Sequence, residues 1–318
     1  MSPRRGTRSL GEVLTSRSLV WVAAIVVVLV VVDAVLVAMA LSRTAPEANR
    51  EPGPVPTFTS TPFPSHGSSG TPTPSASAGS SDTGEPAASS RLLTAVDGKQ
   101  AWRAVSGTCG GDAGTLERSV DGGATWSPVG LGVGSRTVLA LRADGASVSA
   151  LTGTGDNCAP SVRTSKDDGA TWDTGVAGAA GAGVTPTGLV LDTGAVASPC
   201  PDPAAVYQGQ YTTAVVCDGS VSWRKGTGAW VSVALSGVQS LADAGDEYTV
   251  ARTGVAGCEG VRIDSMRATG VTASTTTSRL GCADDAAADG VVVARAGQSV
   301  WLWSGDVVRV SADGGATW

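Results

Sequence analysis

Chemistry in the C-terminal part of this chain would have to come from carboxylates, tyrosines and arginines, because the only histidine is His66. Residues 91–318 hold 19 aspartates, together with three glutamates and three tyrosines: Glu117, Glu247, Glu259, Tyr207, Tyr211 and Tyr248. The lack of histidine excludes a Ser-His-Asp triad from this region. No glycine-rich phosphate loop leads into a helical pattern. A pair of carboxylates could still hydrolyse a glycoside, so glycoside hydrolysis is the enzymatic activity that the composition leaves open.

The six cysteines also lie in this region, at Cys109, Cys158, Cys200, Cys217, Cys258 and Cys282. Neither histidine nor C-x-x-C spacing accompanies them, so we expect no metal site and no cofactor. An even number of cysteines outside a membrane indicates disulfides and an oxidising compartment. Six cysteines allow 15 pairings, and the sequence alone does not choose among them.

Composition divides the chain into four parts. Residues 1–18 are basic, 19–41 are apolar apart from Asp33, 42–90 contain nine of the 16 prolines, and 91–318 have a globular composition. An apolar run of about 20 residues can cross a bilayer, and the preceding arginines would keep the N-terminus in the cytoplasm. We therefore predict a single-pass signal anchor, a disordered Pro/Ser/Thr-rich stalk and an extracytoplasmic domain.

Two features of the apolar run leave alternatives. Ala38-Met39-Ala40 resembles a signal-peptidase site, but a cleaved signal peptide usually has a shorter apolar core, of about 7–15 residues. Asp33 inside the run would either contact a partner helix or be a tolerated acid that reaches outward or stays protonated. We expect an uncleaved anchor and a tolerated acid.

The domain at 91–318 is acidic, with 22 Asp and Glu against 16 Lys and Arg. Nucleic-acid binding needs clustered basic residues, so we expect no nucleic-acid partner. The expected contacts are the membrane, through the anchor, and an extracytoplasmic protein or glycan.

One short phrase recurs along the domain. It reads SVDGGATW at 119–126, SKDDGATW at 165–172 and SADGGATW at 311–318, and weaker copies read VCDGSVSW at 216–223 and RIDSMRAT at 262–269. The aspartates of the five copies are 46, 51, 46 and 49 residues apart. A regular period of this size predicts a repeat architecture.

Short β-rich runs bounded by Gly, Asp or Ser precede each full copy of the phrase. They are 92–96, 101–105 and 115–120; 137–142, 147–151 and 161–165; and 291–295, 299–303 and 307–310. Asp97-Gly98, Asp144-Gly145 and Thr193-Gly194 provide turns. Several strands in each period predict an all-β propeller of about five four-stranded blades. The last blade would be three-stranded, take a strand from another segment, or be completed by further chain.

The phrase resembles the Asp-box, or BNR repeat, of propellers in sialidases, sortilin-type receptors and photosystem II assembly factors. The resemblance implies that the box forms the turn between the third and fourth strands and is structural. The residues concerned are Ser119, Asp121, Gly123, Thr125, Trp126, Ser165, Asp167, Gly169, Thr171, Trp172, Asp218, Gly219, Trp223, Asp264, Ser311, Asp313, Gly315, Thr317 and Trp318.

The same resemblance places Cys109, Cys158, Cys258 and Cys282 on the face opposite the boxes. A bridge between Cys109 and Cys158 then joins matching loops of adjacent repeats. Pairing Cys258 with Cys282 and Cys200 with Cys217 completes the simplest scheme, while the other pairings stay open.

A sialidase is the sharpest catalytic alternative. That family carries an arginine triad, a Tyr–Glu nucleophile pair, an Asp acid/base and an Arg-Ile-Pro motif, and this motif is missing here. Glu247 and Tyr248 are neighbours, so on a strand they point to opposite faces. We therefore expect a binding or scaffold module, with a divergent exo-sialidase-like glycoside hydrolase or an assembly factor for a membrane complex as the alternatives.

Overall fold

The computed structural model describes Val26, residues 91–155 and residues 157–318. The predicted basic tail at 1–18, the anchor at 19–41 and the stalk at 42–90 lie outside these residues, apart from Val26. Among the described residues, no helix is both long and apolar enough to cross a membrane.

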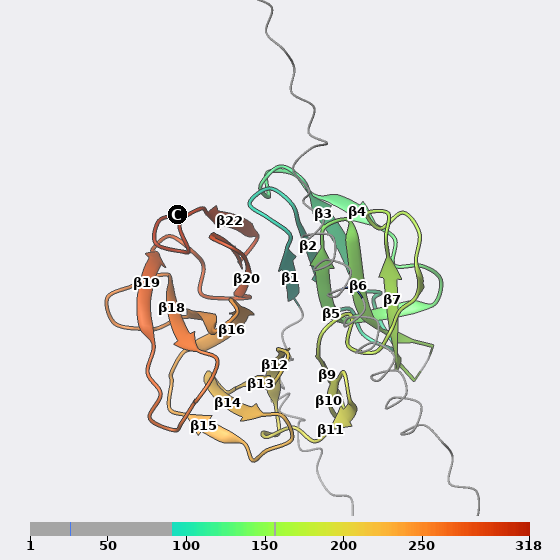
Figure 1. Ribbon diagram of the computed structural model, residues 1–318. Helices are drawn as coiled ribbons and strands as arrows, with labels where there is room; N and C mark the ends of the chain where they lie inside the picture. The colour runs from blue at the N-terminus through green and yellow to red at the C-terminus, as the bar shows by residue number, and fades with distance from the viewer. Residues whose placement is uncertain (1–25, 27–90, 156) are drawn as a thin grey trace, which may run out of the picture. The chain divides into compact units, whose positions relative to one another are not determined.

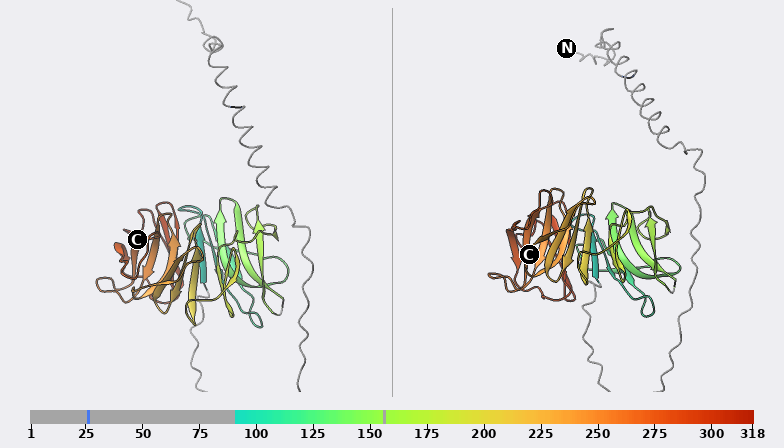
Figure 2. Two further views of the ribbon diagram at one scale, coloured as in Figure 1. Left: turned by 60° about the horizontal axis from the view of Figure 1, so that its bottom comes forward. Right: turned by 90° about the horizontal axis from the view of Figure 1, so that it is seen from below.

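The domain is built from six antiparallel sheets, which we call blades A to F in chain order. Figure 1 shows the blades following one another around a ring, and Figure 2 shows their strands running between its two faces. The first three blades contain β1 (Arg91–Ala95), β2 (Ala101–Val105), β3 (Thr115–Ser119) and β4 (Ser127–Val129); β5 (Ser135–Asp144), β6 (Ser147–Thr154), β7 (Ala159–Ser165) and β8 (Asp173–Thr174); and β9 (Gly183–Thr185), β10 (Gly188–Leu191) and β11 (Gly194–Val196).

The last three blades complete the ring. They contain β12 (Pro203–Gln208), β13 (Thr212–Cys217), β14 (Ser220–Lys225) and β15 (Val231–Val233); β16 (Val238–Asp243), β17 (Glu247–Arg252), β18 (Val261–Arg267) and β19 (Ser278–Ala283); and β20 (Val292–Ala296), β21 (Ser299–Ser304) and β22 (Val307–Ser311). The first strand of each blade contacts the first strand of the next, and β20 contacts β1. The domain is therefore an all-β, six-bladed propeller.

The strands form where the sequence pattern predicted them. All nine predicted runs coincide with strands of blades A, B and F, and each of the three predicted turns separates two adjacent strands. The described part of the domain, 91–155 and 157–318, contains no helix. Short β-rich runs bounded by Gly, Asp or Ser were thus a sufficient guide to these elements.

The predicted number of five blades is wrong. Blade C has three strands of only three or four residues and lacks the recurring phrase. It lies entirely within the 51-residue interval between Asp167 and Asp218. A number of blades predicted from the copies of the phrase therefore did not include it. The repeat period set a lower limit on the number of sheets, because a blade can pack in the ring without carrying the phrase.

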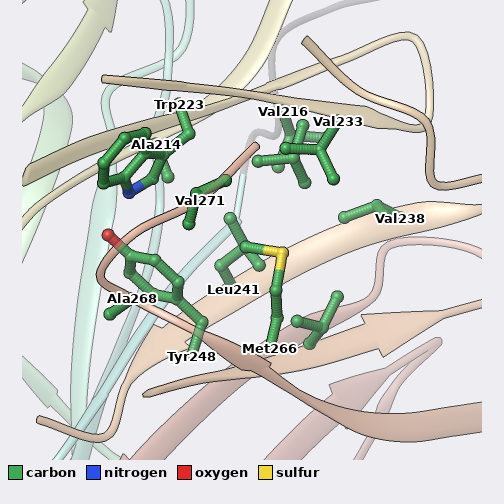
Figure 3. Packing of buried hydrophobic residues seen from close by; sticks show 12 residues of the cluster. Ala214, Val216, Trp223, Val233, Val238, Leu241, Tyr248, Met266, Ala268 and Val271 are labelled. Atoms are coloured by element: carbon green, nitrogen blue, oxygen red, sulfur yellow. The ribbon is translucent and has the colours of Figure 1, made fainter. Parts of the chain in front are cut away.

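Apolar side chains form one cluster at each of the six blade-to-blade interfaces. Figure 3 shows the largest, where Trp223 and Ala214 of blade D pack against Leu241, Tyr248 and Met266 of blade E. A sheet stacked between two neighbours buries side chains on both faces. The core is therefore a ring of interfaces, which holds every blade in place through its neighbours.

Blades F and A close the ring through side chains. Trp301 of blade F is fully buried and its Nε1 donates a 2.7 Å hydrogen bond to the Asp97 carbonyl oxygen of blade A. The guanidinium of Arg103 lies 4.4 Å from the ring centre of Trp126 and 5.0 Å from that of Trp303. Such cation–π contacts are worth about 1–2 kcal/mol when partly desolvated. Blade F itself has three strands, which is one of the three forms considered for the last blade.

Candidate functional site

The three full copies of the phrase fold into one turn geometry, which we call the phrase turn (119–126, 165–172 and 311–318). In the first, Asp121 accepts hydrogen bonds from the Ser119 hydroxyl at 2.8 Å and from the Thr125 amide and hydroxyl at 3.0 and 2.6 Å. Ser119 Oγ in turn accepts from the Gly123 amide at 2.9 Å. The same four bonds occur around Asp167 and Asp313. Each turn joins the third strand of a blade to the position of the fourth, as expected.

Hydrogen bonding at these turns stabilises the charged aspartates. The Thr125 hydroxyl and amide, with Ser119, lower the pKa of Asp121 to about 2, and the equivalent groups lower the pKa of Asp167 to about 2. The hydroxyls of Ser311 and Thr317 lower the pKa of Asp313 in the same way. Carboxylates fixed by three or four internal donors have little capacity left for a ligand, so the phrase turns are structural elements.

The two weaker copies of the phrase are not phrase turns. Asp218 and Gly219 form the two-residue turn between β13 and β14, with φ angles of 45° and 70°. Two positive φ angles are the mark of a type I′ hairpin, which also favours Asp-Gly. Trp223 lies within β14 and packs in the core between blades D and E. The prediction of a box at this position is wrong because two kinds of turn share the same residues.

The prediction of a box at Asp264 is also wrong, because this residue lies within a strand and not in a turn. It lies in the middle of β18 and is fully buried. It accepts hydrogen bonds from Arg252 Nη1 at 2.9 Å, Arg262 Nε at 2.7 Å and Thr277 Oγ1 at 2.8 Å. This carboxylate therefore joins three segments of blade E: β17, β18 and the loop that leads into β19.

The disulfides follow the simplest predicted scheme: Cys109–Cys158, Cys200–Cys217 and Cys258–Cys282. The first joins the β2–β3 loop of blade A to the end of the β6–β7 loop of blade B. The second joins the connection before blade D to the end of β13. The third joins the β17–β18 loop to β19. All three lie at the ends of strands on the face opposite the phrase turns, which we call the disulfide face.

The disulfide face is formed by the loops after each second strand and by the connections between blades. Hydrogen bonds join the two kinds of segment, as from the Val238 amide to the Gly219 carbonyl and from the Gly305 amide to the Asp289 carbonyl. The described parts of these segments carry nine carboxylates, all exposed, and no lysine or arginine: Asp112, Asp192, Asp202, Asp218, Glu259, Asp284, Asp285, Asp289 and Asp306. Asp285 forms an ion pair with Arg309 at 3.1 Å.

This acidic face is the candidate site that the sequence reasoning missed. The signal was available, because the connecting segments lack basic residues in the printed sequence. The sequence does not show which of these connections lie on the same face of the propeller. The long loops at 106–114 and 253–260 are each held by a disulfide, so part of the face is fixed before any ligand arrives.

A depression on the disulfide face has a volume of about 760 Å³ and is lined by residues 254–259 and Asp284. Two carboxylates, Glu259 and Asp284, border it. The sulfurs of Cys258 and Cys282 approach Asp284, and the three residues together resemble a metal-ligand set. The two sulfurs are bonded to each other, so they do not supply the thiolates that a metal would need.

Four of the six glutamates and tyrosines of the domain make side-chain contacts within the fold. Glu117 forms a 2.7 Å ion pair with Arg103, and Glu247 accepts from the Ser265 hydroxyl at 2.6 Å. Glu247 is exposed and Tyr248 is buried in the core between blades D and E, so the two side chains point to opposite faces of β17, as predicted. The Tyr248 hydroxyl contacts Thr212 at 2.9 Å. Burial raises the pKa of Tyr207 and Tyr248. Within the described part of the chain, these tyrosines and glutamates do not form hydrogen-bonded pairs with each other.

Comparison with known proteins identifies no family for this chain. No family model and no curated protein matches the chain. Among solved structures, it resembles YCF48 bound to D1 peptide, with 16% identity over 73% of this chain and 81% of that one and a TM-score of 0.29. It also resembles the native Bacillus subtilis arabinanase Arb43A, with 11% identity over 70% of this chain and 92% of that one and a TM-score of 0.38. A third similar structure is Trypanosoma rangeli sialidase, with 10% identity over 67% of this chain and 46% of that one and a TM-score of 0.29. Similarity at this level concerns the β-propeller architecture, and proteins of one fold differ in activity.

Proposed function

We propose that this protein is a membrane-anchored, extracytoplasmic β-propeller with Asp-box turns, and that it binds a basic protein partner through its disulfide face. The observation that carries the proposal is the set of nine exposed carboxylates on segments without a lysine or arginine in their described parts. Such a surface attracts cationic ligands and repels nucleic acids and anionic glycans such as sialosides.

The geometry of the face supports binding. Six sets of loops converge around one ring, and two of the longest are held by disulfides at Cys109–Cys158 and Cys258–Cys282. Ordering a loop before a partner arrives lowers the entropy cost of association. Carboxylates presented on such loops would contribute to the rate of association and to specificity more than to the total affinity.

The arginines support binding rather than glycoside hydrolysis. Arg252 and Arg262 both donate to the buried Asp264, and Arg103 pairs with Glu117 between two indole rings. An arginine that is already bound to a carboxylate of its own blade is not free to hold the carboxylate of a substrate.

The proposed location rests on the arrangement of the sequence and on the three disulfides. An apolar segment of 23 residues at 19–41, preceded by arginines, would anchor the chain with its N-terminus inside. Disulfides persist in an oxidising compartment. Protease treatment of intact spheroplasts should digest residues 91–318 and leave an N-terminal fragment in the membrane fraction. Protection of the propeller would contradict this location.

The binding proposal is tested with the full chain in mild detergent as bait for solubilised membrane and envelope proteins. A variant with Glu259→Gln, Asp284→Asn, Asp289→Asn and Asp306→Asn should lose most of the partner that the wild type captures, and capture should weaken with added salt. A control variant carries three charge-removing substitutions, Asp144→Asn, Asp173→Asn and Asp246→Asn, at exposed aspartates away from the disulfide face, and should capture the partner normally.

Two results would contradict the proposal. One is equal capture of the partner by both variants, which would show that the acidic face does not contribute to binding. The other is turnover of a sialoside or another glycoside by the purified chain, which would favour the enzymatic alternative.

A further inference from the structure

Arg224 is a buried arginine whose hydrogen-bond donors have no acceptor among the described residues. The residue is 9% exposed. No described carboxylate forms an ion pair with its guanidinium, and no described oxygen accepts a hydrogen bond from it. The side chain of an arginine carries donors only and stays charged. Because buried polar groups nearly always have partners, this side chain needs a physical explanation.

The other arginine of similar burial has what Arg224 lacks. Arg252 is 8% exposed, and its guanidinium donates to Asp264 Oδ2 at 2.9 Å and to the Ser236 carbonyl oxygen at 2.8 Å. Arg224 instead has an aromatic contact, with its Cζ 4.4 Å from the ring centre of Trp230. A cation–π contact covers one face of a guanidinium. It leaves the N–H groups, which lie in the plane of the guanidinium, without acceptors.

Two hydroxyl groups beside Arg224 also have no partner. Thr213 lies directly opposite Arg224 on β13, and Ser222 lies two residues earlier on β14, so all three side chains point to the same face of blade D. Both residues are buried, and neither hydroxyl forms a hydrogen bond with a described residue. Val215, opposite Ser222, and Trp230 belong to the apolar cluster between blades C and D. The three residues, which we call the Arg224 cluster, therefore face blade C.

The Arg224 cluster keeps a route to solvent. Arg224 is next to the last residue of β14 (Ser220–Lys225), at the end of the strand away from the Asp218-Gly219 turn of the disulfide face. Nε is the one of its unbonded nitrogens that protein atoms cover completely, so the two Nη atoms remain accessible. These two atoms form the fork with which an arginine binds both oxygens of a carboxylate. The cluster is thus separate from the acidic surface of the proposed function.

We propose that the Arg224 cluster binds the carboxylate group of a ligand between blades C and D. The two Nη atoms would donate to its two oxygens, and the hydroxyls of Thr213 and Ser222 would supply further donors. One positive charge is available there, because Lys225 follows Arg224 on β14 and so points to the opposite face of the sheet. A planar, singly charged carboxylate matches this donor set better than a doubly charged phosphate. The net charge of −6 on the chain also opposes multiply charged anions.

Binding would remove the cost of an unpaired charge at this interface. A guanidinium that is buried without a counter-ion destabilises the folded chain. A carboxylate that binds the folded state alone therefore raises the free energy of unfolding as its concentration rises. If Arg224 served only to stack on Trp230, stability would not depend on carboxylates in this way.

The test follows the Nε–H signals of the arginines by heteronuclear NMR. It uses the full chain in mild detergent at neutral pH, with sodium acetate as the probe and sodium chloride at the same ionic strength as the reference. The Arg224 signal, identified by its loss in Arg224→Lys, should shift with acetate and saturate in the millimolar range. The Arg252 signal should not shift, because its donors are already bonded. Thr213→Val keeps the shape of the side chain without the hydroxyl and should weaken acetate binding by about fivefold.

Urea unfolding supplies a second measurement. Replacing chloride by acetate should raise the urea midpoint of the wild type more than that of Arg224→Met, because general salt effects act on both proteins. Phosphate and methyl sulfate should have smaller effects than acetate. N-acetylglycine and glucuronate distinguish the carboxylate at the end of a peptide from that of an acidic sugar, and the one that binds more tightly identifies the source.

Two results would overturn the proposal. If the Arg224 signal does not respond to molar acetate, or responds equally to chloride, water satisfies the guanidinium and its role is to stack on Trp230. If phosphate binds more tightly than acetate, the cluster is not a carboxylate site. The NMR titration uses the wild-type chain, so its outcome does not depend on the folding of Arg224→Met.

Discussion

Trp301 Nε1 donates a hydrogen bond of 2.7 Å to the carbonyl oxygen of Asp97, 204 residues earlier in the chain. The bond joins the last blade to the first. Both groups lie at an interface that also holds Trp126, whose ring meets that of Trp301 edge-on at 6.3 Å. The ring is therefore closed by packing and by hydrogen bonds from side chains to the backbone, which include this bond and those from Arg91 Nη1 to the Gly290 and Gly305 carbonyl oxygens.

Trp301→Phe should lower the free energy of unfolding by about 1 kcal/mol more than Trp102→Phe. Both indoles are fully buried, but Trp102 Nε1 has no hydrogen-bond partner in the structure, so only the first substitution removes a bond. Urea unfolding of both variants, followed by circular dichroism, measures the difference. Equal losses would show that the bond to Asp97 does not contribute to closure.

Acid should destabilise the propeller through the phrase turns. The pKa of Asp121 and Asp167 is about 2 in the folded protein, against about 3.9 in an unfolded chain. A lowered folded pKa gives stability that is complete above about pH 4 and is lost as the pH falls toward 2. The melting temperature of a variant with Asp121→Asn, Asp167→Asn and Asp313→Asn should fall less over that range.

The control for this prediction is Asp144→Asn, at an exposed aspartate outside the phrase turns, which should keep the wild-type pH profile. An unchanged profile in the triple variant would mean that the acid sensitivity arises elsewhere.

Removing one member of the Arg252–Asp264–Arg262 cluster should strongly lower the free energy of unfolding. Asp264 is fully buried and both arginines donate to it, so Asp264→Leu leaves two guanidinium groups without their counter-ion. We expect a loss of about 3–5 kcal/mol in the free energy of unfolding. Replacing all three with Arg252→Met, Asp264→Leu and Arg262→Met should restore most of that stability, because no charge is then left buried alone. A triple variant as unstable as the single one would contradict this explanation.

The three disulfides should contribute unequally. The bridged cysteines are 49 residues apart in Cys109–Cys158 and 17 apart in Cys200–Cys217. Chain-entropy arguments give about 4 kcal/mol for the longer loop and about 3 kcal/mol for the shorter. Paired Cys→Ser variants, unfolded in urea under oxidising conditions, should follow this order. The reverse order would indicate that effects in the folded state exceed loop entropy.

Local sequence determined much of this protein. The strand runs, the turns at Asp97-Gly98 and Asp144-Gly145, and the three phrase turns follow from β-rich composition and turn chemistry within about ten residues. The structure confirms each of these strand and turn positions. The disulfide pairs did not follow from local sequence, which allows 15 pairings; the structure confirms the simplest scheme, which was expected from the resemblance to Asp-box propellers. The anchor and stalk remain predictions from composition.

The tertiary structure alone decided the rest. The number of blades depends on how many sheets pack around the ring, and blade C packs in it without even a weak copy of the phrase. Asp218 and Asp264 could not be interpreted from spacing, because an Asp-Gly pair suits a two-residue hairpin as well as a longer turn, and a buried aspartate depends on arginines brought to it by β17 and β18. The acidic face arises from connections far apart in sequence. Only ring closure places them side by side, because their positions depend on packing between blades and not on the residues within each connection.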